Sequence, residues 1–139
     1  MKTRILIPLM MVLILAGCTA DRPSAGQEWL LDSMVVNGET IDLSNTNPIT
    51  LKFSASNQVG GSSGCNSYFG EMEFLSDGGL SAGAFGGTEM ACEKGMDTEA
   101  TYLGALGQVN AYTYSELQLT LTGNDGQTVL TFLLLQTVE

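Results

Sequence analysis

Hydrophobic and polar residues alternate along most of the chain after residue 28, which is the pattern of half-buried β-strands. Segment 49–53 places Ile49, Leu51 and Phe53 on one face, and segment 117–121 does the same with its three leucines. Residues that tolerate positive φ, such as Asn and Gly, separate the segments and predict tight turns. Further strands are predicted at 29–36, 39–43, 68–75, 80–85 and 129–135.

The pattern changes to helical spacing once, just after residue 95. Asp97 is expected to cap this helix, because its carboxylate can accept a hydrogen bond from a free backbone N–H. Met96, Ala100, Leu103 and Leu106 recur every three or four residues and are expected to face the core. Many short strands with one helix predict a strand-dominated α+β fold, a small antiparallel β-barrel that is cracked, meaning incompletely closed.

The first 17 residues are predicted to be a lipoprotein signal peptide and not part of this fold. Lys2 and Arg4 precede an apolar run at 5–15, which is shorter than the roughly 20 residues that a helix needs to span a bilayer. The run ends in LAGC at 15–18, which resembles the lipobox of bacterial lipoproteins. We therefore expect Cys18 to carry the lipid that anchors the chain to a membrane. An ordinary secretory signal with a chance cysteine is the alternative.

Residues 18–27 lack apolar periodicity and are predicted to be a flexible tether between the lipidated cysteine and a domain at 28–139. Thr19 follows the cysteine, at the position where aspartate is the usual signal for retention in the inner membrane. For a Gram-negative source, we therefore expect the periplasmic face of the outer membrane.

Charge and composition exclude several classes of function. Without Lys2 and Arg4, three basic residues remain against fifteen acidic ones, a formal charge of −12. Nucleic acid is therefore not an expected partner, because its binding depends on Lys and Arg. The chain has no histidine, which excludes Ser-His-Asp and Cys-His catalysis and a His-ligated metal. We expect neither an enzyme nor a cofactor.

Cys65 and Cys92 remain as a pair once Cys18 is assigned to the lipid. In an exported domain, such a pair predicts a disulfide. Two buried free thiols are the alternative. A metal site is disfavoured, because the sequence contains no Cys-x-x-Cys motif.

Two motifs resemble the signatures of the META domain, also called the HslJ family. GCNSYFG at 64–70 resembles its Gly-Cys-Asn-x-x-x-Gly signature, and TEMAC at 88–92 matches its Thr-x-Met-Ala-Cys element. The resemblance covers nearly all of 28–139. It implies a β-rich fold with one helix, similar to the cracked barrels of type III secretion pilotins. Many members are envelope lipoproteins, the HslJ branch is associated with heat shock and novobiocin resistance, and no biochemical activity is established for them.

The motif residues allow a structural and a functional interpretation. In the structural one, Asn66 bonds the local backbone, and Tyr68 and Phe69 pack inside the barrel. In the functional one, Asn66 and Tyr68 line a groove whose adaptable apolar wall includes Met72 and Met90. The candidate binding residues of the motifs are Gly64, Asn66, Tyr68, Gly70 and Met90.

The expected function is that of a non-enzymatic binding or structural module in envelope stress, heat shock or drug tolerance. Its partner would be an envelope protein. One alternative is a pilotin-like carrier that holds a lipid chain or an amphipathic peptide in an apolar cavity. Another is a protease-inhibitor-like module.

Overall fold

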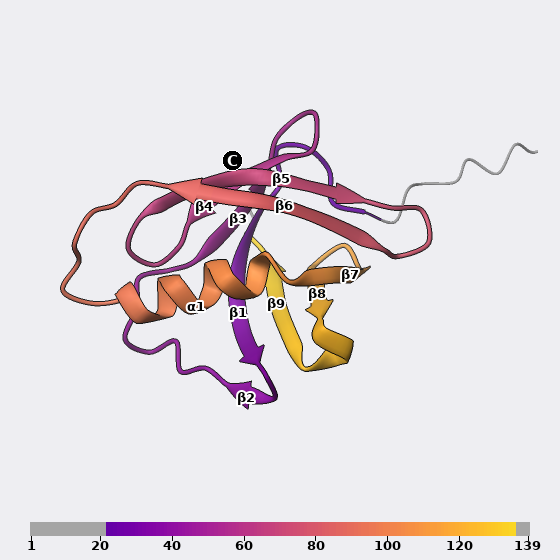
Figure 1. The fold of residues 1–139 in the computed structure, drawn as a ribbon. Coiled ribbons are helices and arrows are strands. Elements are labelled where there is room, and N and C mark those ends of the chain that lie inside the picture. Colours follow the sequence, from indigo (N-terminus) through magenta and orange to yellow (C-terminus); the bar gives the residue numbers. More distant parts are fainter. Residues whose placement is uncertain (1–21, 136–139) are drawn as a thin grey trace, which may run out of the picture.

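Nine antiparallel strands curl into a nearly closed barrel in the computed structural model, which describes residues 22–135 (Figure 1). Their order is β6-β5-β4-β3-β1-β9-β8-β7, and the short β2 pairs with β1. The predicted fold class is confirmed. The elements are β1 (Glu28–Val36), β2 (Glu39–Thr40), β3 (Thr50–Phe53), β4 (Gln58–Ser62), β5 (Ser67–Phe74), β6 (Leu80–Gly87), α1 (Met96–Leu106), β7 (Val109–Tyr114), β8 (Gln118–Gly123), the 3₁₀ turn η1 (Asn124–Gly126) and β9 (Thr128–Leu134).

The predicted signal peptide at 1–17, Cys18 and the start of the predicted tether lie outside the described residues. The rest of that tether belongs to the domain. Pro23 is buried, Gly26 N–H donates to the Phe53 carbonyl at 2.7 Å, and Phe53 N–H donates to the Gln27 carbonyl at 3.1 Å. No helix within 22–135 is long and apolar enough to cross a membrane.

The barrel interior is filled by the inward side chains of the strands, as the alternating pattern predicts. On β3 the inward residues are those expected, whereas Leu117 precedes β8 and is 59% exposed. Edge-to-face aromatic contacts connect opposite walls, such as Tyr102 with Phe132 at 6.5 Å between ring centroids. The largest fully buried hydrophobic side chains are those of Trp29, Tyr102, Phe132, Met34, Leu51, Met72, Leu106, Leu119, Leu121 and Leu130.

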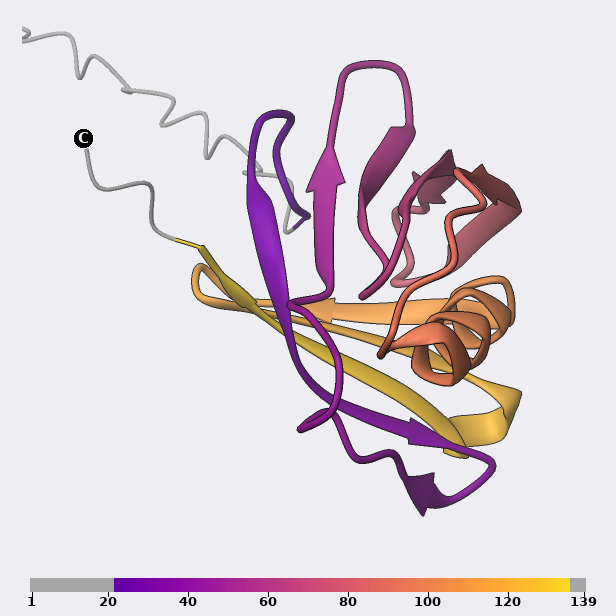
Figure 2. The ribbon, with the colours of Figure 1, turned by 90° about the vertical axis from the view of Figure 1, so that its left-hand side faces the viewer.

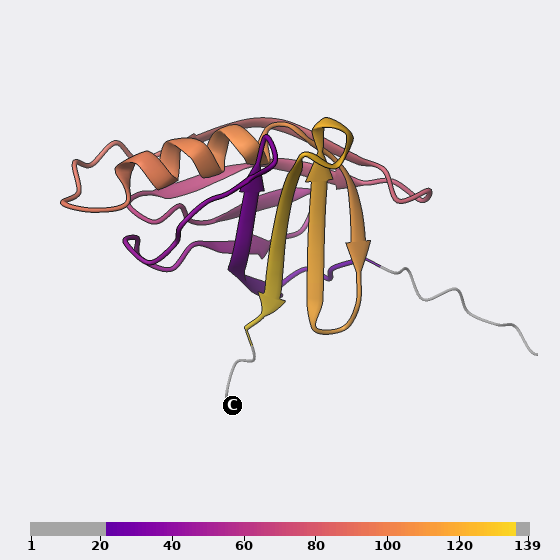
Figure 3. The same ribbon diagram turned by 90° about the horizontal axis from the view of Figure 1, so that it is seen from below.

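The barrel has one unsealed seam, between the edge strands β6 and β7. These strands meet at one end, where Gly79 bridges Ala111 and Tyr112 N–H donates to the Gly78 carbonyl at 3.0 Å. Farther along, α1 lies across the open side (Figure 2). Seen from below, β1, β9, β8 and β7 stand side by side, and α1 extends beyond β1, on the side of the row away from β7 (Figure 3).

The helix lies where the sequence predicts it, but its inner face differs in part from the prediction. Tyr102, Ala105 and Leu106 are its buried residues, whereas Met96 is 45% exposed. Asp97 lies in the first turn and makes no capping hydrogen bond; the N-cap is Gly95, in the left-handed conformation at φ 88°.

Of the predicted stripe, Leu106 is buried and Leu103 packs against the core, whereas Met96 and Ala100 are exposed. The inner face turns instead toward Tyr102, whose hydroxyl lies 2.8 Å from the Tyr68 hydroxyl inside the barrel.

Candidate functional site

The motif at 64–70 forms the turn into β5 and the first half of that strand. Gly64 starts it at φ 98°, and a side chain there would collide with the Thr46 hydroxyl. The Gly64 carbonyl accepts a hydrogen bond from the Asn47 side chain at 2.9 Å. This position therefore requires glycine for the path of the chain, and Gly64 has a structural role.

Asn66 ties this turn to the segment before α1 and to α1 itself. Its side chain is 4% exposed, and its Oδ1 accepts from Met90 N–H at 2.7 Å and from the Thr88 hydroxyl at 2.9 Å. Its Nδ2 donates to the Met90 carbonyl at 3.2 Å and to Glu99 Oε1 at 2.8 Å. The predicted bonding of the side chain to local backbone is thus wrong: apart from a bond to the neighbouring Cys65 sulfur at 3.4 Å, its partners lie 22 to 33 residues away.

Glu99, in the first turn of α1, forms a polar cluster with Asn66 and Ser63. Its Oε2 accepts from the backbone N–H of Asn66 at 2.7 Å and from the hydroxyl of the buried Ser63 at 2.5 Å. Desolvation raises the pKa of the Glu99 carboxyl, but the hydrogen bonds from Ser63 and Asn66 together lower it more. The pKa of Glu99 consequently lies below its usual range, and the carboxylate is the form that the fold selects.

The lowered pKa of Glu99 makes the stability of the fold depend on pH in the acidic range. A carboxyl whose pKa is lowered on folding stabilises the native state above the pKa of the unfolded chain, about 4.3 for glutamate, and that contribution is lost as pH falls through the folded value. We expect Glu99→Gln to be less stable than the wild type at pH 7 and to lose less stability between pH 5 and pH 3. Urea unfolding at a series of pH values measures both. Glu116→Gln, at an exposed site, should keep the wild-type acid dependence.

A disulfide between Cys65 and Cys92 fastens the same junction, with the two Cα atoms 5.8 Å apart. The thioether of Met96 lies 3.7 Å from the sulfur of Cys65. The structure thus contains the predicted pairing. Met90, in the same segment, has its backbone bonded to Asn66 and its side chain 59% exposed.

Tyr68 and Gly70 have roles inside the barrel. The Tyr68 hydroxyl donates to the Thr50 carbonyl at 2.8 Å and lies 2.8 Å from the Tyr102 hydroxyl. Burial raises the pKa of both tyrosines well above the usual value, so both are neutral. At Gly70 the missing side chain leaves room for the ring of Phe85.

The predicted groove is therefore not formed. Asn66, Tyr68 and Met72 are all buried, and of the four proposed lining residues only Met90 is exposed. The structural interpretation of Asn66 and Tyr68 holds, with different partners for Asn66. For Phe69 the prediction of an interior position was wrong.

Phe69 points outward from β5 and is 67% exposed. Its cross-strand neighbours are Gly60 on β4 and Gly86 on β6, so its ring stands on a sheet surface without flanking side chains. The ring end lies over Gly86, 3.2 Å from the position a Cβ would take. The sequence carried a signal for this: adjacent residues of a strand face opposite sides, so Tyr68 and Phe69 cannot both face the core.

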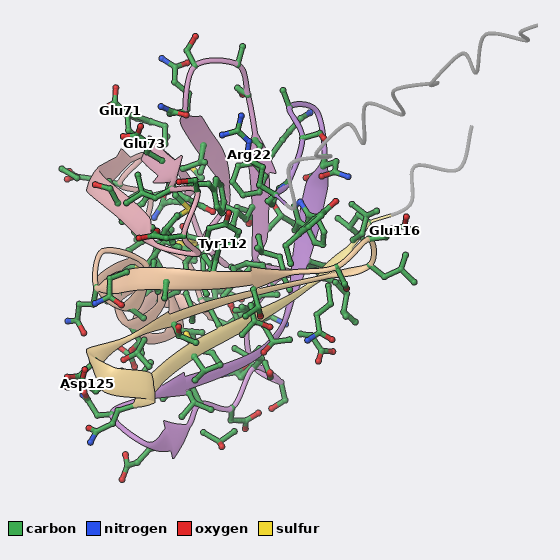
Figure 4. The ribbon with its side chains drawn as sticks, turned by 90° about the vertical axis from the view of Figure 1, so that its right-hand side faces the viewer. Arg22, Glu71, Glu73, Tyr112, Glu116 and Asp125 are labelled. Carbon is green, nitrogen blue, oxygen red and sulfur yellow. A yellow bond between two sulfur atoms is a disulfide. The ribbon has the colours of Figure 1, made fainter. Side chains whose placement is uncertain are left out.

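A surface hollow of about 540 Å³ adjoins Phe69. Its walls come from β4, β5, the first residue of the β3–β4 turn and one residue of β6. The exposed Glu71 lies on its rim. Glu71 and Glu73 project from β5 on the same side of the molecule, away from Glu116 (Figure 4). The lining residues are Ser54, Gln58, Val59, Gly60, Phe69, Gly70, Glu71 and Ala84.

No group of three or more His, Cys, Asp or Glu residues that could hold a metal ion occurs in the part of the chain that the structure describes. The polar cluster around Asn66 is satisfied by its own hydrogen bonds. The chemistry offered at the surface is that of an aromatic ring beside carboxylates, which suits binding.

The model of the META domain matches residues 22–135. The chain belongs to the META domain family. The match begins where the structure begins to describe the chain, and it includes residues 22–27, which pack on the barrel.

Solved structures agree with this assignment. The chain is similar to a protein from Burkholderia xenovorans known from an NMR structure, at 32% identity and a TM-score of 0.67, over 81% of this chain and 84% of that one. A second NMR structure matches at 27% identity and a TM-score of 0.56, over 77% and 87%. A crystal structure of a duf4847 family protein from Bacteroides vulgatus shares the fold at 14% identity and a TM-score of 0.56, over 78% and 92%. No curated protein matches the chain.

Proposed function

We propose that this chain is a lipid-anchored envelope protein whose META domain binds a partner protein and catalyses no reaction. The LAGC sequence at 15–18 supports the anchor, and Thr19 supports the periplasmic face of the outer membrane as its location. The resemblance to the HslJ branch supports a role in envelope stress, heat shock or drug tolerance.

The observation that carries the binding role is the exposure of Phe69. An aromatic side chain that is 67% exposed beside a hollow has the character of an anchor residue, because aromatic side chains are enriched among the residues that contribute most to protein interfaces. The side chain is also held in place, because its strand is paired on both sides and its ring end rests on Gly86. A rigid ring loses little conformational entropy when a partner covers it.

The interior of the barrel favours surface binding over the alternative of a pilotin-like carrier. A carrier of a lipid chain needs an apolar cavity between the sheets. Here the centre is occupied by fully buried side chains that include Trp29, Tyr102 and Phe132. A partner that docks on the outer face of β4, β5 and β6 requires no rearrangement of this core.

The proposal is tested by photocrosslinking in living cells. A photoreactive phenylalanine analogue replaces Phe69 in the full chain, and the matched control replaces Leu117, which is similarly exposed at 59% on another part of the surface. We expect position 69 to capture one defined envelope protein in the membrane fraction, and position 117 not to capture it. Identical adducts at both positions, or none at 69, would contradict the proposal.

A further inference from the structure

We infer that the hollow beside Phe69 receives an arginine side chain of the partner protein, with the aromatic ring and the Glu71 carboxylate as its two recognition elements. This inference rests on the proposed function, because it names the chemistry of the partner that docks on this face. Its first basis is that both residues line the same hollow.

The hollow is a fixed feature of the sheet. A Cβ at Gly60 would lie 2.8 Å from the Tyr68 carbonyl oxygen, and one at Gly70 would collide with the Phe85 ring. Glycine is therefore required at both positions by the packing of the barrel. Gly60 pairs with Phe69 and has no side chain to fill the hollow beside the ring, whereas Gly70 faces the interior, where Phe85 packs against it. The paired strands keep the hollow open before any partner arrives.

The spacing of the two recognition elements suits one long side chain. Residues i and i+2 of a strand project on the same face about 7 Å apart, which places the ring of Phe69 and the carboxylate of Glu71 within reach of one guanidinium group and its stem. Guanidinium groups stack on aromatic faces and donate two parallel hydrogen bonds to a carboxylate. Arginine is the side chain that uses both elements at once.

The negative charge of this face also favours an arginine side chain as the ligand. Glu71 and Glu73 project side by side from β5 (Figure 4), and the exposed Lys52 on β3 pairs with Gly60 at the other side of the hollow. Two carboxylates and one lysine leave this face anionic, and the chain after Cys18 carries a formal charge of −12. An anionic ligand is repelled by this field, and a neutral apolar one must desolvate the carboxylate without compensation. A second copy of this chain would bring the same negative charge, so a basic surface of a different protein is the occupant that fits.

A titration with a defined probe tests the inference. The ¹⁵N-labelled full chain in detergent micelles is titrated with Nα-acetyl-arginine methylamide and separately with the isosteric, uncharged citrulline compound. We expect the arginine compound to shift the amide signals of Gly60, Gly70 and Ala84 with saturation in the millimolar range. Phe69→Ala and Glu71→Gln should each weaken this binding about threefold.

The controls separate a specific site from diffuse attraction of cations. Leu117→Ala and Glu116→Gln change a similarly exposed apolar residue and a carboxylate far from the hollow, and both should leave the affinity unchanged. Equal shifts with the citrulline compound, no saturation, or equal weakening by Glu116→Gln would overturn the inference. If position 69 still captures one envelope protein in cells under those outcomes, the proposed function stands and only the arginine chemistry fails.

Discussion

Replacing Cys65 and Cys92 together with serine is expected to lower the free energy of unfolding by about 3.5 kcal/mol. The bridge joins residues 27 positions apart, and closing a loop of this size restricts the unfolded chain by about that amount in the chain-entropy model. Urea unfolding, followed by the fluorescence of the buried Trp29, measures the loss.

In the folded state, few interactions other than the disulfide hold the segment that precedes α1. The segment between β6 and α1 contains no regular structure. It is attached to the rest of the fold by the disulfide, by the hydrogen bonds of Asn66, and by a pair of hydrogen bonds between Thr88 and the backbone of Ser67. Removing the bridge therefore loosens the start of α1, which covers the seam. Reduction of the wild-type chain with dithiothreitol is the matched control and should reproduce the loss. A loss below about 1 kcal/mol by either route would mean that the bridge contributes little.

The fold was predictable from the sequence because it depends on local patterns. Alternation predicts most of the strands, but not β4, whose glycine- and serine-rich sequence does not alternate. Asn37-Gly38 marks a turn whose residues both have positive φ, at 53° and 82°. The cysteine count predicted the disulfide. These features need no knowledge of distant contacts, since strand period, turn chemistry and cysteine pairing are each expressed within a few residues or in the composition.

The site was less predictable because its decisive contacts join distant segments. Asn66 and Glu99 are 33 residues apart, and neither residue type indicates its partner. The burial of Tyr102 is not predictable from helical spacing, because the partner of its hydroxyl is Tyr68 on β5, 34 residues away. The outward position of Phe69 is predictable from the strand period, which outweighs hydrophobicity here because the neighbouring Tyr68 faces the core.

The second large effect is expected at the Asn66 side chain. Asn66→Ala should lower the free energy of unfolding by about 3 kcal/mol, because truncation removes the five hydrogen bonds of a buried side chain and leaves its partners unpaired. The amide N–H of Met90 and the Glu99 carboxylate are the groups most affected. Urea unfolding at pH 7 measures the loss.

Asn47→Ala is the control for this substitution, because Asn47 makes a single side-chain bond to the Gly64 carbonyl in the same region and is exposed. It should cost about 1 kcal/mol or less. Asn66→Ala and reduction of the disulfide act on the same segment, so their combined effect should be smaller than the sum of the two. Once either the Asn66 hydrogen bonds or the disulfide is lost, the segment before α1 is partly disordered. The remaining interaction then stabilises less ordered structure. Full additivity would show that Asn66 and the disulfide act independently.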